Sequence, residues 1–111
     1  MNEKVQIEAA WDNRELTKDP QVIQAIENVI DALNEGRIRV AEPTDDGWIV
    51  NDWIKKAILL YFPIRQMELK EIGIFEYHDK MKLKTGYKAS GVRVVPPAVA
   101  RHGAYLAKGV I

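Results

Sequence analysis

Arg93 is the residue of this sequence whose type and position most clearly suit a binding role. It stands in the segment GVRVVPP, residues 91–97. A guanidinium can bind a carboxylate through two parallel hydrogen bonds. Pro96 and Pro97 restrict the backbone that follows, and a restricted segment loses less conformational entropy when its side chain binds. From the residues alone, Arg93 either binds an anionic ligand in this way or is a solvated residue of a strand.

Lys55 and Lys56 are the second candidate pair, because they interrupt the apolar segment WIKKAILLYF. Their stems can pack against the protein while their ammonium groups stay in water. Alternatively, one ammonium group faces an anionic ligand. Both interpretations remain open from the sequence.

Several other chemistries are disfavoured by composition. The chain has no cysteine, which excludes disulfides, thiolate catalysis and cysteine-ligated metals. His78 and His102 are the two histidines, and neither has metal-ligand spacing with the other or with nearby acids. We therefore expect no metal site and no bound cofactor.

The charges are balanced overall but divided along the chain. Lys+Arg and Asp+Glu are 16 each. Residues 1–50 hold eleven acids and five bases, a net charge of −6, and residues 51–111 hold five acids and eleven bases, a net charge of +6. This division indicates either an anion-binding surface or solvated faces that happen to differ. The basic segment with Lys80, Lys82, Lys84 and Lys88, with two tyrosines interleaved, could suit single-stranded nucleic acid, but zero net charge favours a solvated loop.

A length of 111 residues, with 47% apolar and 29% charged residues, is typical of one soluble domain. The start of the chain has no signal-peptide pattern, and its longest apolar stretch, AILLYFPI, is far shorter than the roughly 20 residues of a membrane span. We expect a soluble, cytoplasmic protein with no membrane partner.

The elements that must position these residues begin with two helices. EKVQIEAAWDNR places Ile7, Ala10 and Trp11 on one face. In KDPQVIQAIENVIDALNEG, Asp19 can cap the helix, Pro20 fits its first position and Gly36 fits a left-handed stop. The apolar stripe of this second helix predicts the core and consists of Val22, Ile26, Val29, Ile30 and Leu33.

A change of period predicts a β-hairpin over residues 37–50. Ile38 and Val40 alternate with arginines before Pro43 at the strand end, and a DDG turn precedes Trp48. A helix over 52–62 follows, capped by Asn51 or Asp52 and ended by Pro63.

Because its apolar residues run nearly all round, we expect this third helix to be the most buried element, with Trp11 and Trp53 largely buried. Residues 64–90 are expected to be irregular, with a short strand near 72–75. The predicted fold class is α+β.

The last twelve residues divide into two hexads, ARHGAY and LAKGVI. In the second, Leu106, Ala107 and Val110 fit the hexapeptide pattern of parallel β-helices, in which three hexads complete one coil. Because two hexads do not complete a coil, the sequence looks cut where a solenoid begins. His102 occupies a free hexad position, so we do not expect a catalytic base there. Arg101 and Lys108 are expected at solvent-facing corners.

The segments IEAAWDNR, RIRVAEP, GWIVNDWIKKAILLYF, YHDK and GVRVVPPAVARHGAYLAKGVI follow one another along the whole chain. With them the chain resembles the tetrahydrodipicolinate (2,3,4,5-tetrahydropyridine-2,6-dicarboxylate) N-succinyltransferase family. The resemblance implies an N-terminal α+β domain over 1–95 and the truncated start of a left-handed β-helix over 96–111. It also implies a homotrimer with active sites between neighbouring β-helices.

The resemblance implies transfer of succinyl from succinyl-CoA, as co-substrate, to the amino group of acyclic tetrahydrodipicolinate, in diaminopimelate and lysine biosynthesis. Arg93 is then the residue that binds the dicarboxylate. The family's acidic residue lies beyond Ile111, so no catalytic residue is expected in this chain, which we expect to be inactive alone. The chain departs from the family at DKMKLK, where Lys82 replaces a proline, and the stretch before GVRVVPP is short. The alternative is a stand-alone, non-catalytic interaction or oligomerisation module that docks through its terminal hexads.

Overall fold

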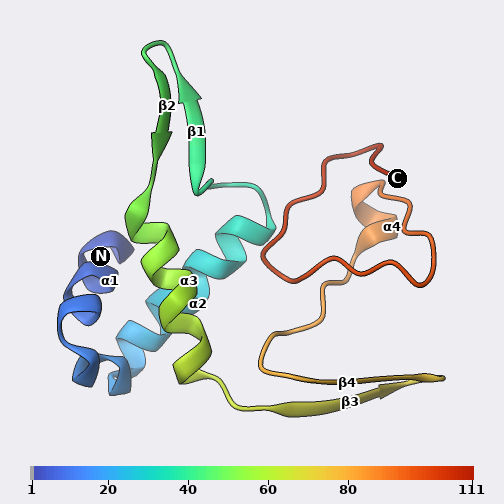
Figure 1. Ribbon diagram of the computed structural model, residues 1–111, viewed down its shortest axis with the longest axis horizontal. Coiled ribbons are helices and arrows are strands. Elements are labelled where there is room, and N and C mark those ends of the chain that lie inside the picture. Colours follow the sequence, from blue (N-terminus) through green and yellow to red (C-terminus); the bar gives the residue numbers. More distant parts are fainter. Residues whose placement is uncertain (1) are drawn as a thin grey trace.

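The computed structural model describes residues 2–111 and places a body of three helices beside a C-terminal half built from a hairpin and long loops (Figure 1). The elements in chain order are α1 (Glu3–Asp12), the 3-10 helix η1 (Arg14–Lys18), α2 (Pro20–Asn34), β1 (Ala41–Thr44), β2 (Gly47–Val50), α3 (Asp52–Ile64), β3 (Glu68–Ile72), β4 (Phe75–Asp79) and α4 (Tyr87–Ser90). This combination of helices and antiparallel hairpins agrees with the predicted α+β class.

The core lies among α1, α2 and α3. Its buried side chains are Ile7, Ala10, Val22, Ile26, Val29, Ile30, Ile54, Ala57, Leu60 and Tyr61. The apolar stripe predicted for the second helix is confirmed, since four of its members are in this cluster and Leu33 packs against it. The shared face of Ile7 and Ala10 is confirmed as well.

The ends of α2 follow the chemistry read from the sequence. The Asp19 side chain accepts a hydrogen bond from the Gln21 N–H at 2.8 Å, and Pro20 is the first helical residue. Gly36 has φ +75°, the left-handed conformation that glycine adopts without strain. These three residues therefore set where α2 begins and ends.

The two tryptophans predicted to be largely buried are only partly buried. Trp11 and Trp53 both pack against the core cluster. The Trp11 ring is covered by cations, because the Arg14 guanidinium lies 4.4 Å and the Lys56 ammonium 5.8 Å from its centroid. An indole at the rim can keep such cation contacts, which complete burial would remove.

The first hairpin is shorter than predicted. β1 pairs antiparallel with β2, with Thr44 opposite Gly47, so the turn residues are Asp45 and Asp46. Residues 37–40 lie outside the strand, although Ile38 and Val40 still pack on the core. Pro43 lies inside β1 rather than at its end, which is tolerated because both strands of a two-stranded sheet are edges.

Asn51 explains why the hairpin ladder stops where it does. Its backbone N–H donates to the Val40 carbonyl at 2.7 Å, and its side-chain amide donates to the Arg39 carbonyl, also at 2.7 Å. The side chain is thereby bound to the preceding segment, and it makes no capping bond to α3. Asn51 is therefore the N-cap residue of α3, one of the two residues predicted for that position, but its side chain does not cap the helix.

Two further expectations for α3 are wrong. The helix runs to Ile64, so Pro63 lies inside its last turn and Arg65 is the C-cap. A proline this close to the end removes one hydrogen bond without stopping the turn. Nor is α3 the most buried element: α2 has six buried residues and α3 has four, while Leu59 is 47% exposed.

Residues 64–90 contain a hairpin where one short strand was predicted. β3 pairs antiparallel with β4, with Ile72 opposite Phe75. Only Lys70 and Tyr77, which face each other, are half-buried. The sequence carries only a weak strand signal here, because β3 lacks a period-2 alternation and that of β4 is limited to Phe75 and Tyr77.

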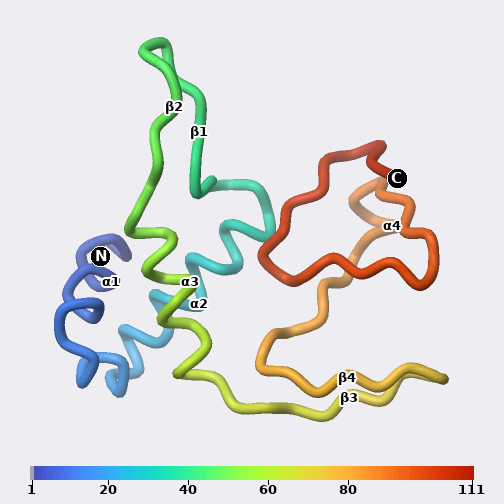
Figure 2. Tube along the Cα trace, viewed as in Figure 1, coloured from blue at the N-terminus to red at the C-terminus, as the bar shows by residue number. Residues whose placement is uncertain are grey.

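The C-terminal half adds almost nothing to the core. Val92 is the one buried hydrophobic residue described after Tyr61, with 8% exposure. The Cα radius of gyration is 15.8 Å, whereas a compact domain of this length has a radius near 13 Å. Figure 2 shows the trace of residues after β4 making a wide loop beside the helices rather than a packed layer.

Candidate functional site

Arg93 lies on a segment held by backbone hydrogen bonds to the end of the chain. The Arg93 N–H donates to the Val110 carbonyl at 2.9 Å, and the Gly109 N–H donates to the Gly91 carbonyl at 2.9 Å. Gly91 has φ +74°, and a Cβ there would lie 2.9 Å from Cγ of Lys108. The glycine therefore permits both the turn after α4 and the close approach of the second hexad.

The Arg93 side chain is exposed at the rim of an apolar cavity of about 450 Å³. The residues that line it are Val92, Arg93, Val94, Val95, Ala98, Val99, Ala100, Leu106, Val110 and Ile111. Arg93 is the only charged residue in this lining set. The arrangement can bind a carboxylate beside an apolar surface, but its lining offers no side chain for proton transfer.

The structure does not bring Lys55 or Lys56 to this cavity. Lys55 is exposed on α3, and Lys56 lies over the Trp11 ring of α1. In Figure 1, α1 and the C-terminal loops lie on opposite sides of the molecule. The Lys56 position matches the packed-stem alternative, with its ammonium group over an aromatic face.

A polar joint at the C-terminal end of α2 holds the C-terminal half against the helical body. The Asn34 Oδ1 atom accepts two hydrogen bonds, from Lys84 Nζ at 2.7 Å and from the Gly103 N–H at 3.0 Å. One turn earlier, Asp31 Oδ1 lies 3.0 Å from His102 Nε2. We refer to these five residues as the joint; they connect α2, the basic segment and the first hexad.

The joint is partly shielded from water. Burial lowers the pKa of Lys84, so its ammonium group is desolvated where it contacts Asn34. The His102 side chain is 13% exposed and the Asp31 side chain 40%. His102, which occupies a free hexad position, lies with its imidazole against Asp31 of α2. Arg101 and Lys108 are exposed, as expected.

Two contacts reinforce the joint. The Tyr105 ring lies on Gly36, where a Cβ would be 2.7 Å from the ring carbon Cδ1. At the C-terminal end of α3, Arg65 Nε donates to the Lys80 carbonyl at 3.0 Å, and Arg65 Nη1 lies 3.9 Å from Glu27 Oε1. The first hexad and the basic segment are therefore both fixed to the helical body.

Sequence reasoning missed the joint entirely. Asn34 is separated by 50 residues from Lys84 and by 69 from Gly103. Each of these residues is ordinary in its local context, and a polar contact across such separations leaves no periodic pattern. The one available signal was Gly36, which follows the end of α2 and so fixes where the last residues of that helix lie.

The described residues 2–111 include no helix that is both long enough and apolar enough to cross a membrane. Within the same range, no group of three or more histidine, aspartate or glutamate side chains is arranged to hold a metal ion. The candidate site is therefore described by Arg93, its apolar cavity and the joint.

Comparison with known proteins gives a consistent set of relatives. The family model described as "Tetrahydrodipicolinate N-succinyltransferase N-terminal" matches residues 3–64, more than half of the chain. Proteins named 2,3,4,5-tetrahydropyridine-2,6-dicarboxylate N-succinyltransferase are similar over nearly all of it. The one from Bordetella pertussis is 44% identical over 95% of this chain, and the one from Albidiferax ferrireducens is 46% identical over 95%. The one from Pseudoalteromonas translucida is 42% identical over 97%. The chain spans 42–43% of the length of these relatives.

Proposed function

The chain belongs to the tetrahydrodipicolinate N-succinyltransferase family, and we propose that it is the N-terminal part of an enzyme that transfers succinyl from succinyl-CoA to tetrahydrodipicolinate. The observation that carries this proposal is the match of residues 3–64 to the family's N-terminal domain. Identities of 42–46% over at least 95% of the chain support it. The proposal includes a place in diaminopimelate and lysine biosynthesis, in the cytoplasm.

The proposed architecture follows from the same membership. Residues 1–95 form the N-terminal domain, and residues 96–111 begin a left-handed β-helix that assembles as a homotrimer. Two features of the structure support this reading: the second hexad returns to pair with residues 91–93, and its Leu106 and Val110 line an apolar cavity. A further coil stacked on that surface would bury it.

The chemistry asked of the whole enzyme is acyl transfer. The acceptor amine nitrogen forms a bond to the thioester carbonyl carbon, the carbon–sulfur bond breaks, and CoA leaves as its thiol. The amine must lose a proton to a base, and the developing oxyanion needs hydrogen-bond donors. We assign to Arg93 the binding of an acceptor carboxylate; the base belongs to the part of the enzyme outside residues 1–111. Lys55 and Lys56, placed near α1, take no part in this proposal.

The Arg93 assignment is tested in the full-length enzyme with Arg93→Ala. Loss of one charge-assisted contact of about 1.5–3 kcal/mol corresponds to a fall of roughly 10- to 150-fold in kcat/KM for the acceptor. Arg93→Lys should restore little, because an ammonium group cannot replace the guanidinium fork. The KM for succinyl-CoA should stay near its original value. Arg37→Ala, which removes an exposed arginine of the helical body, is the matched control.

An Arg93→Ala enzyme with unchanged acceptor KM and kcat would contradict the assignment while leaving family membership intact. The 111-residue chain by itself is expected to release no CoA from succinyl-CoA in the presence of the acceptor. Turnover near that of the full-length enzyme would overturn the proposed division of labour.

A second candidate function is a non-catalytic interaction module that docks through the hexads. The observation that favours it is the exposure of apolar residues around the Arg93 cavity: Val95 is 51%, Val99 68% and Ile111 80% exposed. Sedimentation of the 111-residue chain distinguishes the two. A stable dimer of the isolated chain would support the module, because the proposed enzyme assembles as a homotrimer, and a monomer would favour the N-terminal part of a larger enzyme.

A further inference from the structure

A second concave surface lies beneath the β3–β4 hairpin and meets the Arg93 cavity at residues 98–100. It consists of two adjoining cavities of about 210 and 200 Å³, which we call the basic cavity and the aromatic cavity and together the hairpin groove. Five residues line both cavities: Tyr77, Leu83, Lys84, Val99 and Ala100. A backbone bridge between Leu83 and Arg101 fixes the basic segment and the first hexad at this groove.

The basic cavity has an excess of positive charge. Its charged lining residues are four bases, Lys70, Lys82, Lys84 and Arg101, and two acids, Glu68 and Asp79. Lys70 Nζ pairs with Glu68 Oε2 at 3.1 Å, so this lysine and one acid are matched. Of the described residues, none places a carboxylate oxygen within 4.0 Å of the Lys82 or Arg101 nitrogens.

Lys84 adds a partly desolvated cation that contacts only a neutral acceptor. Its ammonium group donates to Asn34 Oδ1, which is a neutral acceptor. Burial lowers the Lys84 pKa, because the charged form has lost water without gaining an opposite charge. An anion in the basic cavity would supply that charge in a partly desolvated setting, where ion pairs are stronger than at an open surface.

The aromatic cavity offers the opposite chemistry. Ile72, Phe75, Tyr77 and Tyr87 line it together with Ala98, Val99 and Ala100, and Lys84 is its one charged lining residue. Ile72 is 49% and Phe75 43% exposed, although both could be covered by a small apolar group. Apolar surface of this kind beside a cationic cluster is typical of sites for amphiphilic anions.

We propose that the hairpin groove binds a small organic carboxylate whose anionic group lies in the basic cavity and whose aromatic or short aliphatic body lies in the aromatic cavity. Arg101 and Lys82 bind the carboxylate, and Phe75 and Tyr77 contact the body. Each cavity is smaller than a drug-sized pocket, so one or two fused rings is the largest body that fits. Arg93 lines neither cavity of the groove, although residues 98–100 also line the Arg93 cavity, and the site does not depend on the proposed acyl transfer.

The test is a titration of the ¹⁵N-labelled 111-residue chain with 2-naphthoate at pH 7, followed by amide NMR. 2-Naphthylmethanol, which has the same rings without the charge, is the matched probe. Saturable shifts are expected at amides near 77, 83–84 and 99–101. Naphthoate should bind about tenfold more tightly than the alcohol, as one charge-assisted contact implies.

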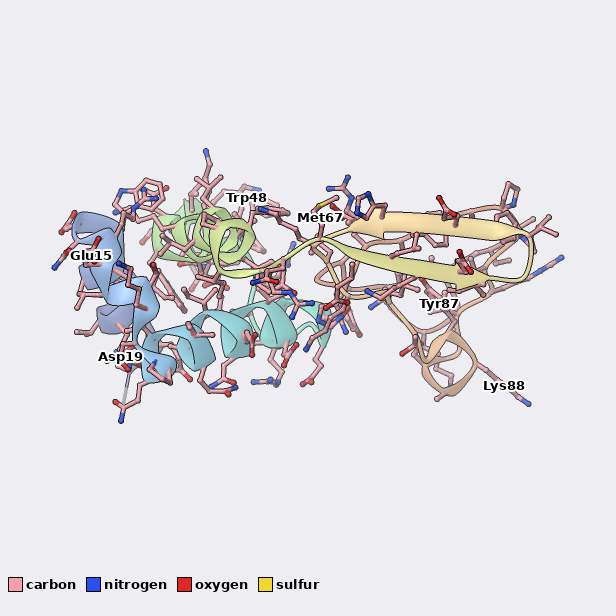
Figure 3. All side chains as sticks on the ribbon, turned by 90° about the horizontal axis from the view of Figure 1, so that it is seen from below. Glu15, Asp19, Trp48, Met67, Tyr87 and Lys88 are labelled. Carbon is pink, nitrogen blue, oxygen red and sulfur yellow. The ribbon has the colours of Figure 1, made fainter. Side chains whose placement is uncertain are left out.

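Two variants and a control locate the anion. Arg101→Gln and Lys82→Gln should each weaken naphthoate binding by about fivefold to tenfold, with little effect on the alcohol. Lys88→Gln should leave binding unchanged, since Lys88 lines neither cavity and projects away from the hairpin in Figure 3. Preserved amide dispersion shows that each variant is folded.

Four results would overturn the proposal. The first is absence of saturable shifts up to about 10 mM probe, where even weak specific sites fill. The second is equal affinity for acid and alcohol. The third is shifts confined to residues 92–95, 106 and 110–111, which line the Arg93 cavity but not the hairpin groove. The fourth is a Lys88→Gln effect as large as that of Arg101→Gln.

Discussion

Replacing Asn34 by alanine should release the C-terminal half from the helical body without unfolding the body. Asn34 Oδ1 accepts hydrogen bonds from Lys84 Nζ and from the Gly103 N–H, so one atom serves two distant segments. Alanine removes both bonds. It is also a better helix former than asparagine, so α2 itself should lose nothing at its last residue.

The magnitude follows from the two bonds. A hydrogen bond from a charged donor contributes about 1.5–3 kcal/mol and one from a neutral amide about 0.5–1.5 kcal/mol. Because both are only part-buried and the lysine regains water when freed, we expect a net loss near 2 kcal/mol rather than their sum. A change of that size increases the local opening of the first hexad by about 30-fold.

Amide hydrogen exchange measures this opening residue by residue. In Asn34→Ala, exchange at Gly103 should accelerate by about 10- to 100-fold, while exchange at Ile26 and Val29 in the core of α2 should not change. Asn34→Asp is the control, because its carboxylate keeps an acceptor for both donors and should keep Gly103 protected.

Unchanged exchange at Gly103 in Asn34→Ala would show that the joint does not hold the hexad. An equal acceleration at Gly103 and Ile26 would show that the joint and the core open together, which would equally refute a locally released segment. Either result would require another explanation for how residues 100–105 stay beside α2.

Three further predictions concern the core of the helical body and the end of α2. Ile26→Ala should lower the unfolding free energy by about 2–5 kcal/mol in chemical denaturation, because Ile26 is fully buried. Ile74→Ala, at a side chain that is 94% exposed, should change it by less than about 0.5 kcal/mol. Similar values for both variants would contradict the core assignment. Gly36→Ala places a left-handed alanine against the Tyr105 ring, so it should lower the unfolding free energy more than Gly73→Ala, which has a similar φ but open space around it. Equal losses of about 1 kcal/mol in unfolding free energy would show that the ring contact is unimportant. Tyr61→Phe should leave stability unchanged or raise it, because the buried hydroxyl makes no hydrogen bond within 3.5 Å, although the Lys82 backbone lies near enough to act on its pKa. Burial is the larger influence and raises the Tyr61 pKa. The stability linked to the protonated hydroxyl is therefore present below the unfolded value of about 10 and is lost as pH rises through the folded value, so the variant should flatten that alkaline decline.

The helical body was predictable because its signals are local. Asp19, Pro20 and Gly36 act within one turn of the helix end, and the apolar stripe repeats at helical spacing. The predicted boundaries of an element were wrong where a residue outside that element determines them. Asn51 ended the first hairpin by binding Arg39 and Val40, and no propensity of residues 37–40 could show it.

The candidate site was only half predictable for a similar reason. Arg93 could be singled out because Pro96 and Pro97 follow it within four residues of the sequence. The joint could not, since Asn34, Lys84 and His102 meet through the path of the whole chain. The β3–β4 hairpin was missed because its faces are largely exposed: apolar and polar residues do not alternate along β3, and along β4 they alternate only at residues 75–78.

The position of Arg93 depends on contacts far from it. Its segment pairs with the second hexad, the first hexad is held by Asn34, and Val92 is the only buried hydrophobic residue of this half that the structure describes. Covering one exposed valine or isoleucine side chain of the Arg93 cavity contributes about 1.5–3 kcal/mol, as much as the whole loss expected at the joint. In a longer enzyme that stacks a coil on this cavity, the coil would therefore share the task of holding Arg93. Asn34→Ala should then free the first hexad in the 111-residue chain but change acceptor KM in the full-length enzyme by less than about threefold. A larger change in KM would show that the joint, and not the stacked coil, sets the position of the arginine.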